Sequence, residues 1–129
     1  MKSNRLNIML VDDSQLVIKK LSEILMEVNC VNSLTQANSY IQAASILSNT
    51  PMDVVLMDIK IPGKNGIELL GFIKQNYPSV ITIMFTNQVS QSYQSLCKSI
   101  GCDHFVDKSR EFESIAGLLE SYVPTQPIL

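Results

Sequence analysis

Residues 54–66, VVLMDIKIPGKNG, decide the fold. The stretch opens with four apolar residues that lead directly into Asp58, and Pro62, Gly63 and Gly66 then break regular structure. A continuous apolar run of this length between turn residues is typical of a strand buried on both faces. In an open α/β sheet the functional crevice lies just outside the carboxyl ends of the strands. Because Asp58 stands where such a strand ends, we predict that its carboxylate is functional.

Similar patterns extend outward from this stretch in both directions. Apolar and β-branched runs predict further strands at residues 6–11, 31–37, 80–85 and 103–107. Apolar residues at helical spacing predict helices at residues 14–28, 40–47, 67–77, 93–100 and 112–122. Beyond the last helix, Pro124 and Pro127 are expected to end ordered structure.

Alternation of strands and helices with short connections implies parallel strands, right-handed crossovers and helices on both faces of one sheet. The predicted fold is therefore an α/β, (βα)5, flavodoxin-like doubly wound sheet with strand order 2-1-3-4-5. A chain of 129 residues is the size of one domain, on a prior of about 100–200 residues per domain.

Composition excludes several classes of function. The formal net charge is −2, without the basic stripe that phosphate contacts need, so we expect no direct binding of nucleic acid. No apolar run approaches the roughly 18–20 residues that span a bilayer, and no signal-peptide pattern opens the chain. We therefore expect no membrane contact and a cytoplasmic location. Cys30, Cys97 and Cys102 lack metal-ligand spacing and are expected to be reduced, mostly buried thiols.

Polar residues follow four of the five predicted strands. Asp12 and Asp13 follow the first strand, Asp58 the third, Thr86 the fourth and Lys108 the fifth. In the predicted order the first and third strands flank the switch point, so the three carboxylates are expected to converge there. Such carboxylates repel one another unless a cation intervenes. Oxygen ligands of this kind suit Mg²⁺, which keeps several waters and takes one or two carboxylates plus a phosphate oxygen.

These residue types fit phosphoryl transfer to a carboxylate. An aspartate can attack phosphorus and form an aspartyl-phosphate. The reaction depends on positioning and on neutralising the equatorial oxygens more than on acid–base chemistry. Mg²⁺, the Lys108 ammonium and the Thr86 hydroxyl would each cover one oxygen. We therefore predict that Asp58 is the phosphoryl acceptor.

Each of these residues also has a purely structural interpretation. Asp12 and Asp13 could cap the following helix and interact with its dipole. Thr86 could be the β-branched end of a strand, and Lys108 a surface charge near the last helix. Asp58 could be a solvated turn residue.

The motifs LVDDS, LMDIKIPGKNG and FVDKS, together with the strand-end Thr86, resemble the receiver domain of bacterial response regulators. Residues 1–129 would then form a single receiver domain with its core at about residues 5–123. The resemblance implies that Asp58 accepts a phosphoryl group from a histidine kinase or a histidine phosphotransfer protein. It also implies that Thr86 and Lys108 contact that group. Phe105 would be the switch aromatic, which moves when Thr86 is drawn toward the phosphate.

For the cofactor, the resemblance implies Mg²⁺ bound by Asp12, Asp13, Asp58 and the main-chain carbonyl of Lys60. An alternative for Phe105 is ordinary packing, since aromatic residues are common in strands. The neighbouring His104 is expected to point elsewhere and is assigned no role.

Some positions depart from the family's usual pattern. Asn87 follows Thr86 where alanine or glycine is usual, and Lys60 and Gln88 flank the route by which water would attack the aspartyl-phosphate. We hypothesise that Lys60 and Asn87 slow self-hydrolysis. Ser109 stands where many relatives have proline, but serine also occurs there in other receivers.

The function predicted from the resemblance is a phosphorelay switch without its own output domain. It would dock to an unknown downstream protein, as a monomer or as a phosphorylation-dependent dimer. It would not be a conventional enzyme, since it catalyses only its own Mg²⁺-dependent phosphorylation and slow autodephosphorylation. An aspartate-nucleophile phosphatase needs a second acid two residues later, where this chain has Lys60. Two alternatives stay open: a receiver segment of a longer regulator or hybrid kinase, and an interaction module that works without phosphorylation.

Overall fold

The computed structural model describes residues 5–123, in which five strands alternate with five helices. The strands are β1 (Leu6–Val11), β2 (Val31–Ala37), β3 (Val54–Met57), β4 (Ile81–Thr86) and β5 (His104–Asp107). The helices are α1 (Gln15–Leu25), α2 (Tyr40–Asn49), α3 (Gly66–Asn76), α4 (Gln91–Ile100) and α5 (Ser114–Glu120). All strands pair in parallel in the order β2-β1-β3-β4-β5. The predicted flavodoxin-like topology is confirmed.

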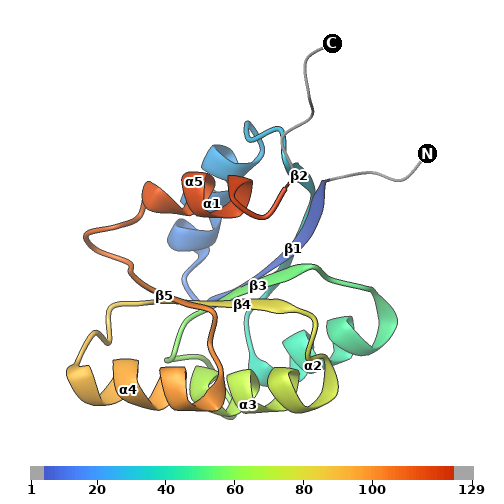
Figure 1. The fold of residues 1–129 in the computed structure, drawn as a ribbon. Coiled ribbons are helices and arrows are strands. Elements are labelled where there is room, and N and C mark those ends of the chain that lie inside the picture. Colours follow the sequence, from blue (N-terminus) through green and yellow to red (C-terminus); the bar gives the residue numbers. More distant parts are fainter. Residues whose placement is uncertain (1–4, 124–129) are drawn as a thin grey trace.

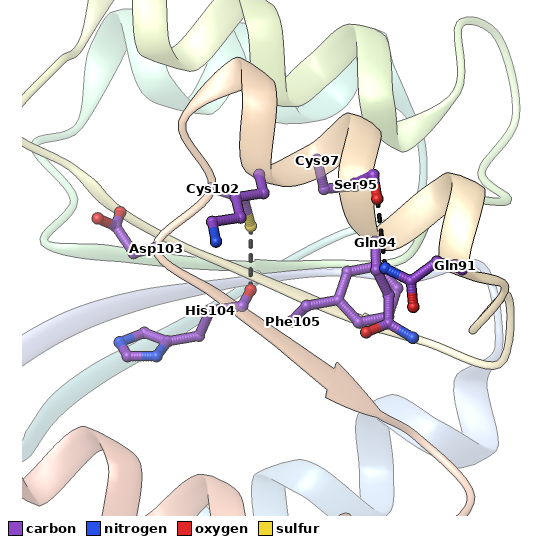
Figure 2. A pocket seen from close by; sticks show the side chains of 9 residues that line it. Gln91, Gln94, Ser95, Cys97, Cys102, Asp103, His104 and Phe105 are labelled. Carbon is purple, nitrogen blue, oxygen red and sulfur yellow. Dashed lines mark hydrogen bonds between the residues drawn. The ribbon is translucent and has the colours of Figure 1, made fainter.

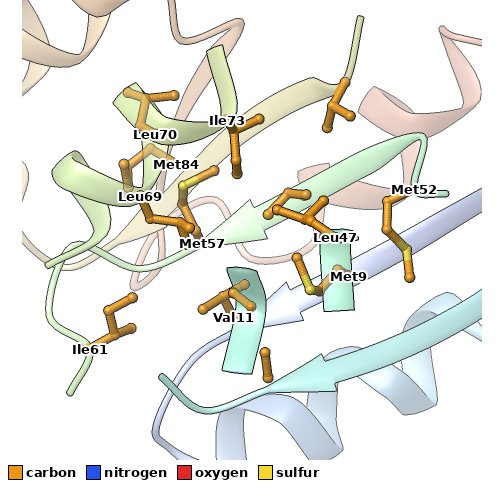
Figure 3. Packing of buried hydrophobic residues seen from close by; sticks show 14 of the residues in the cluster. Met9, Val11, Leu47, Met52, Met57, Ile61, Leu69, Leu70, Ile73 and Met84 are labelled. Atoms are coloured by element: carbon orange, nitrogen blue, oxygen red, sulfur yellow. The ribbon is translucent and has the colours of Figure 1, made fainter. Parts of the chain in front are cut away.

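Helices cover both faces of the sheet, with α1 and α5 on one face and α2, α3 and α4 on the other (Figure 1). Along β1, Ile8 and Leu10 join the core beneath α1 and α5, whereas Met9 and Val11 join the opposite core. Figure 3 shows Met9 and Val11 in this second core with Leu47 of α2. Burial on both faces explains why β1 and β3 are nearly continuous apolar runs rather than alternating patterns.

Strand boundaries match the prediction to within one residue, whereas two helices are shorter than predicted. Helix α1 ends at Leu25 rather than at residue 28, and α5 spans Ser114–Glu120 rather than residues 112–122. The predicted ends were wrong because Val28, Phe112 and Tyr122 pack against the core from outside the helices. Apolar periodicity shows which side chains face the core, but it does not show where helical hydrogen bonding stops.

The turn before α1 bears on the capping alternative for the aspartates. The N-cap residue is Ser14, whose hydroxyl accepts a hydrogen bond from the Val17 N–H at 3.3 Å. Asp12 contributes as well, because its Oδ1 accepts the Ser14 N–H at 2.9 Å. Oδ1 of Asp12 therefore orders the turn, which leaves Oδ2 to accept a hydrogen bond from groups at the edge of the sheet.

Two glycines shape the loop between β3 and α3. Gly63 has a φ of +84°, in the left-handed region that favours glycine. A Cβ atom at Gly66 would lie 1.9 Å from the main-chain oxygen of Asp58. The Gly66 N–H also donates to the main-chain oxygen of Ile59 at 2.7 Å. This close approach lets the first turn of α3 pack against the end of β3 and hold Asp58 at the sheet edge.

The three cysteines are free; Cys30 and Cys97 are buried and Cys102 is half-buried. Burial raises the pKa of the Cys97 thiol to about 11, so this thiol is protonated near neutral pH and a poor nucleophile. The prediction that these thiols are mostly buried is confirmed.

Two further predictions concern the membrane and the end of the chain. Within residues 5–123, no helix combines the length and the apolar character that crossing a membrane requires. Pro124 and Pro127 lie outside the described residues, so their predicted effect on ordered structure is a prediction still.

Candidate functional site

Four strand ends meet at one edge of the sheet. Asp12 follows β1, Asp58 follows β3, Thr86 ends β4 and Lys108 follows β5. Main-chain hydrogen bonds fix two of these positions: the Asp58 N–H donates to Val11 at 3.0 Å, and the Lys108 N–H donates to Thr86 at 2.9 Å. Residues far apart in the sequence are thereby brought within reach of one another.

Lys108 joins two carboxylates. Its Nζ donates to Asp12 Oδ2 at 2.6 Å and to Asp58 Oδ2 at 2.6 Å. The ammonium also lies 5.8 Å from the centre of the Phe85 ring, on the apolar floor of the site. The lysine side chain is only 9% exposed, which contradicts its interpretation as a surface charge.

Thr86 holds the other oxygen of Asp58. Its Oγ1 donates to Asp58 Oδ1 at 2.6 Å and accepts the Gln88 N–H at 3.1 Å. Thr86 is fully buried, so its hydroxyl is turned toward the site and away from solvent. Both oxygens of Asp58 therefore have a donor, one neutral and one cationic, and Asp58 is not a freely solvated turn residue.

The site carries more negative than positive charge. Burial raises the pKa of Asp12, and the hydrogen bond from Lys108 offsets this effect only in part. For Lys108, burial lowers the pKa, but hydrogen bonds to Asp12 and Asp58 outweigh burial and the pKa is raised. The lysine is therefore charged at neutral pH, and a single ammonium is shared between two carboxylates. This imbalance favours binding of a further cation.

The remaining predicted metal ligands lie at the rim. Asp13 is exposed beside the buried Asp12, and Lys60 is exposed in the loop after Asp58. Within residues 5–123, no three carboxylate, imidazole or thiol side chains are grouped so that they could hold a metal ion. Lys108 bridges Asp12 and Asp58 directly. The donors are nevertheless hard oxygen atoms in a site with excess negative charge, and this chemistry fits Mg²⁺.

Phe105 lies in β5, and β4 and β3 separate this strand from β1 and the Asp12 carboxylate. Phe105 lines a groove between α4 and β5. The groove has a volume of about 470 Å³ and is lined by Gln91, Gln94, Ser95, Cys97, Lys98, Cys102, Asp103, His104 and Phe105. Figure 2 shows the Phe105 side chain extending from β5 toward Gln91 and Gln94 of α4. Phe105 is half-buried and packs against the core beneath α2, α3 and α4. It therefore has space on one side in which to move.

Two sets of contacts escaped the sequence prediction. The His104 side chain points away from that of Phe105 (Figure 2). Its Nε2 contacts the Tyr122 hydroxyl. Asp107 accepts hydrogen bonds from both the N–H and the hydroxyl of Ser109. The sequence did contain a signal for the Asp107–Ser109 contacts, because an aspartate side chain commonly accepts a hydrogen bond from the residue two positions later. No sequence signal pointed to the contact between His104 and Tyr122.

Comparison with protein families agrees with the fold. Residues 8–120 match the family model described as the response regulator receiver domain. The chain therefore belongs to the receiver domains of two-component response regulators, a family of phosphoacceptor switches rather than conventional enzymes.

Individual relatives are similar but distant. The chain is 27% identical over 118 residues to the DNA-binding transcriptional activator EvgA of Escherichia coli, covering 90% of this chain and 56% of EvgA. It is 24% identical to protein PilG of Pseudomonas aeruginosa, covering 96% of this chain and 92% of PilG. Among solved structures, the Mn²⁺-bound form of response regulator Rcp1 superposes with a TM-score of 0.79 at 20% identity, covering 96% of this chain and 99% of Rcp1.

The lengths of these relatives differ. The chain spans about half the length of EvgA but nearly all of PilG. The receiver domain is thus found both in longer regulators and in proteins of about this size.

Proposed function

We propose that Asp58 accepts a phosphoryl group from the phosphohistidine of a histidine kinase or histidine phosphotransfer protein. The observation that carries the proposal is the position of Asp58 between the Thr86 hydroxyl and the Lys108 ammonium, at 2.6 Å from each. These are the donors that a transferred phosphoryl group requires, since its charge is spread over oxygens that must be neutralised.

The transfer forms one bond and breaks another. A carboxylate oxygen of Asp58 attacks phosphorus, and the bond between phosphorus and the donor imidazole nitrogen breaks. The imidazole keeps the electron pair of that bond and takes up a proton. Lys108 and Thr86, which now hold the oxygens of Asp58, are proposed to donate to the phosphoryl oxygens as these arrive.

The proposed metal ligands are Asp12, Asp13, Asp58 and the main-chain carbonyl of Lys60. Bound Mg²⁺ would neutralise carboxylate and phosphoryl oxygens that Lys108 alone cannot balance. The excess of carboxylates over ammonium groups supports this assignment. So does the Mn²⁺-bound form of the structural relative Rcp1.

The proposed output is a change at the α4–β5 groove. When Thr86 donates to the phosphoryl group, its hydroxyl leaves its present position and Phe105 moves toward the vacated space. Such a step biases an element that already has two arrangements. A downstream protein would bind the changed surface. In a longer regulator, an output domain such as the one implied by the name of EvgA would respond to the change instead.

The lifetime of the phosphoryl group is proposed to depend on two exposed residues, Lys60 and Asn87. Lys60 stands two residues after Asp58 and Asn87 directly after Thr86, so both are proposed to lie on the route by which water reaches the aspartyl-phosphate. If they slow autodephosphorylation, Lys60→Ala and Asn87→Ala each release phosphate faster than the unsubstituted protein. Unchanged release in both variants would contradict this part of the proposal. A cytoplasmic location, where the phosphodonor would be, is likewise a prediction.

The proposal is tested by incubating the protein with Mg²⁺ and acetyl phosphate and measuring the intact mass. We expect the addition of one phosphoryl group, absent in Asp58→Asn and retained in Asp103→Asn. Asp103 is a suitable control because it too accepts hydrogen bonds from a threonine and a lysine, at the other end of β4. Absence of modification in the unsubstituted protein would favour the interaction module that works without phosphorylation.

A further inference from the structure

Lys108 stands between two residues that are bonded to each other. Asp107 Oδ1 accepts the Ser109 N–H at 3.0 Å and the Ser109 hydroxyl at 2.8 Å. These two bonds close a tight turn around the lysine, because their partners lie directly before and directly after it. The hydrogen bonds from Ser109 also lower the pKa of Asp107, so its carboxylate is a fully ionised acceptor at neutral pH.

The main chain of Asp107 holds the following turn as well. Its carbonyl oxygen accepts the Arg110 N–H at 3.2 Å and the Glu111 N–H at 2.8 Å. Its own N–H donates to Glu111 Oε1 at 3.0 Å. Five hydrogen bonds thus converge on Asp107 from three successive residues of the β5–α5 loop.

Helix α5 does not supply an equivalent anchor for this loop. It has only seven residues, and its N-cap residue Glu113 makes no side-chain capping bond. Immediately before the loop, the Lys108 N–H continues the β4–β5 ladder by donating to Thr86. The lysine main chain is therefore fixed by β4 on one side and by Asp107 on the other.

We propose that Asp107 is a positioning residue for Lys108. Lysine has a flexible four-carbon stem, so a displaced main chain would let the ammonium populate rotamers that miss one of the two carboxylates. By fixing the main chain on the side that β4 does not hold, Asp107 keeps Nζ between Asp12 and Asp58 and, during transfer, beside the phosphoryl oxygens. The inference rests on the proposed function of Asp58.

The first test is the rate of phosphorylation by acetyl phosphate in Mg²⁺, followed by intact mass. Asp107→Ala removes the acceptor for both Ser109 bonds, and we expect about a tenfold lower rate constant, since misplacement of a reacting group by about 1 Å can cost up to 10²-fold. Asp107→Asn keeps an oxygen acceptor at the same place and should react within about twofold of the unsubstituted protein. A rate for Asp107→Ala equal to that of the unsubstituted protein would overturn the inference.

A double-mutant cycle separates positioning from general loop stability. In a Lys108→Ala background there is no ammonium to place, so adding Asp107→Ala should cause no further loss of rate. A further tenfold loss in that background would mean that Asp107 acts otherwise, and the inference would be wrong. If Asp107→Ala does not fold, the exposed Glu111→Ala removes one of the five bonds. It should lower the rate about fivefold, again only when Lys108 is present, and an unchanged rate would then overturn the inference.

Failure of the proposed function has a different signature. If the unsubstituted protein takes up no phosphoryl group, the role of Asp58 is refuted and this inference falls with it. If the unsubstituted protein is modified and Asp58→Asn is not, the proposed function stands whatever the Asp107 variants show.

Discussion

The two ends of β4 carry the same three residue types in different surroundings. At the carboxyl end, Thr86 and Lys108 donate to Asp58 at 2.6 Å each. At the amino end, the Thr82 N–H and hydroxyl donate to Asp103 Oδ2 at 2.8 and 3.1 Å, and Lys74 donates to the same oxygen at 2.9 Å. We call these the carboxyl-end trio and the amino-end trio.

Charge balance and burial separate the two trios. In the amino-end trio one lysine meets one carboxylate, and the Asp103 side chain is 36% exposed. In the carboxyl-end trio the lysine serves a second acid, Asp12, and the Asp58 side chain is 12% exposed. A balanced, solvated trio joins α3, β4 and β5 and calls for no further ligand. A buried trio with surplus negative charge favours the binding of a cation. Bound Mg²⁺ would in turn offset the charge of an incoming phosphoryl group. The same residue types can therefore be structural or reactive, depending on a neighbouring acid and on access to water.

The largest expected difference concerns the two lysines. Lys108→Ala should lower the rate of phosphorylation by acetyl phosphate by about 10²–10³-fold, as loss of one donor to a charged transition state does. Lys74→Ala should remain within about twofold, because its ammonium is bonded to Asp103 and takes no part in the transfer. Both rates are measured by intact mass in Mg²⁺. Equal losses in the two variants would remove the distinction between the trios.

Next in size is the response of stability to Mg²⁺. A ligand at a hundred times its dissociation constant stabilises the folded state by about 2.7 kcal/mol. We expect this gain in urea unfolding of the unsubstituted protein and of Asp103→Asn, but a much smaller one in Asp13→Asn. A full gain in Asp13→Asn would show that Asp13 is not a metal ligand. A loss of the gain in Asp103→Asn would instead place metal at the amino-end trio.

The two threonines should differ by a smaller factor. Thr86→Val keeps the shape but removes the hydroxyl, and we expect about a tenfold slower phosphorylation, the effect of one hydrogen bond to a charged group. Thr82→Val should leave the rate unchanged and lower the free energy of unfolding by about 1 kcal/mol. Kinetics and urea unfolding of both variants test this pair. A slowed Thr82→Val, or an unaffected Thr86→Val, would contradict it.

The smallest expected effect is a pH dependence from Asp103. Burial tends to raise its pKa, but hydrogen bonds from Lys74 and Thr82 outweigh burial and lower it below 3.8. A carboxyl whose folded-state pKa is depressed stabilises the protein above its unfolded pKa, and this contribution is lost as pH falls through the folded value. Because the side chain is partly exposed, we expect a difference of at most about 1 kcal/mol between the unsubstituted protein and Asp103→Asn. Urea unfolding at pH 6 should show this difference, and it should vanish toward about pH 2. A difference that grows on acidification would refute it.

Much of the fold and of the site could be predicted because the signals are local. Continuous or nearly continuous apolar runs mark β1, β3 and β4, and the residue at the end of each run is read directly from the chain. The alternation of strands and helices favours a doubly wound sheet, and the predicted order 2-1-3-4-5 brings Asp58, Thr86 and Lys108 to one edge. The helix ends at Leu25 and Ser114 could not be predicted, since loop residues such as Phe112 pack on the core as helical residues do.

The sequence by itself determined which residue types stand at the carboxyl ends of the strands, because that depends only on where each apolar run stops. Only the tertiary structure decided which of them touch. The contact between Lys108 and Asp12 crosses 96 positions and depends on the placement of β5 relative to β1. The bonds of Asp107 to its loop, the approach of Gly66 to Asp58 and the amino-end trio likewise arise from packing. Side-chain contacts of this kind are set by distances between elements, and the order of residues along the chain does not contain those distances.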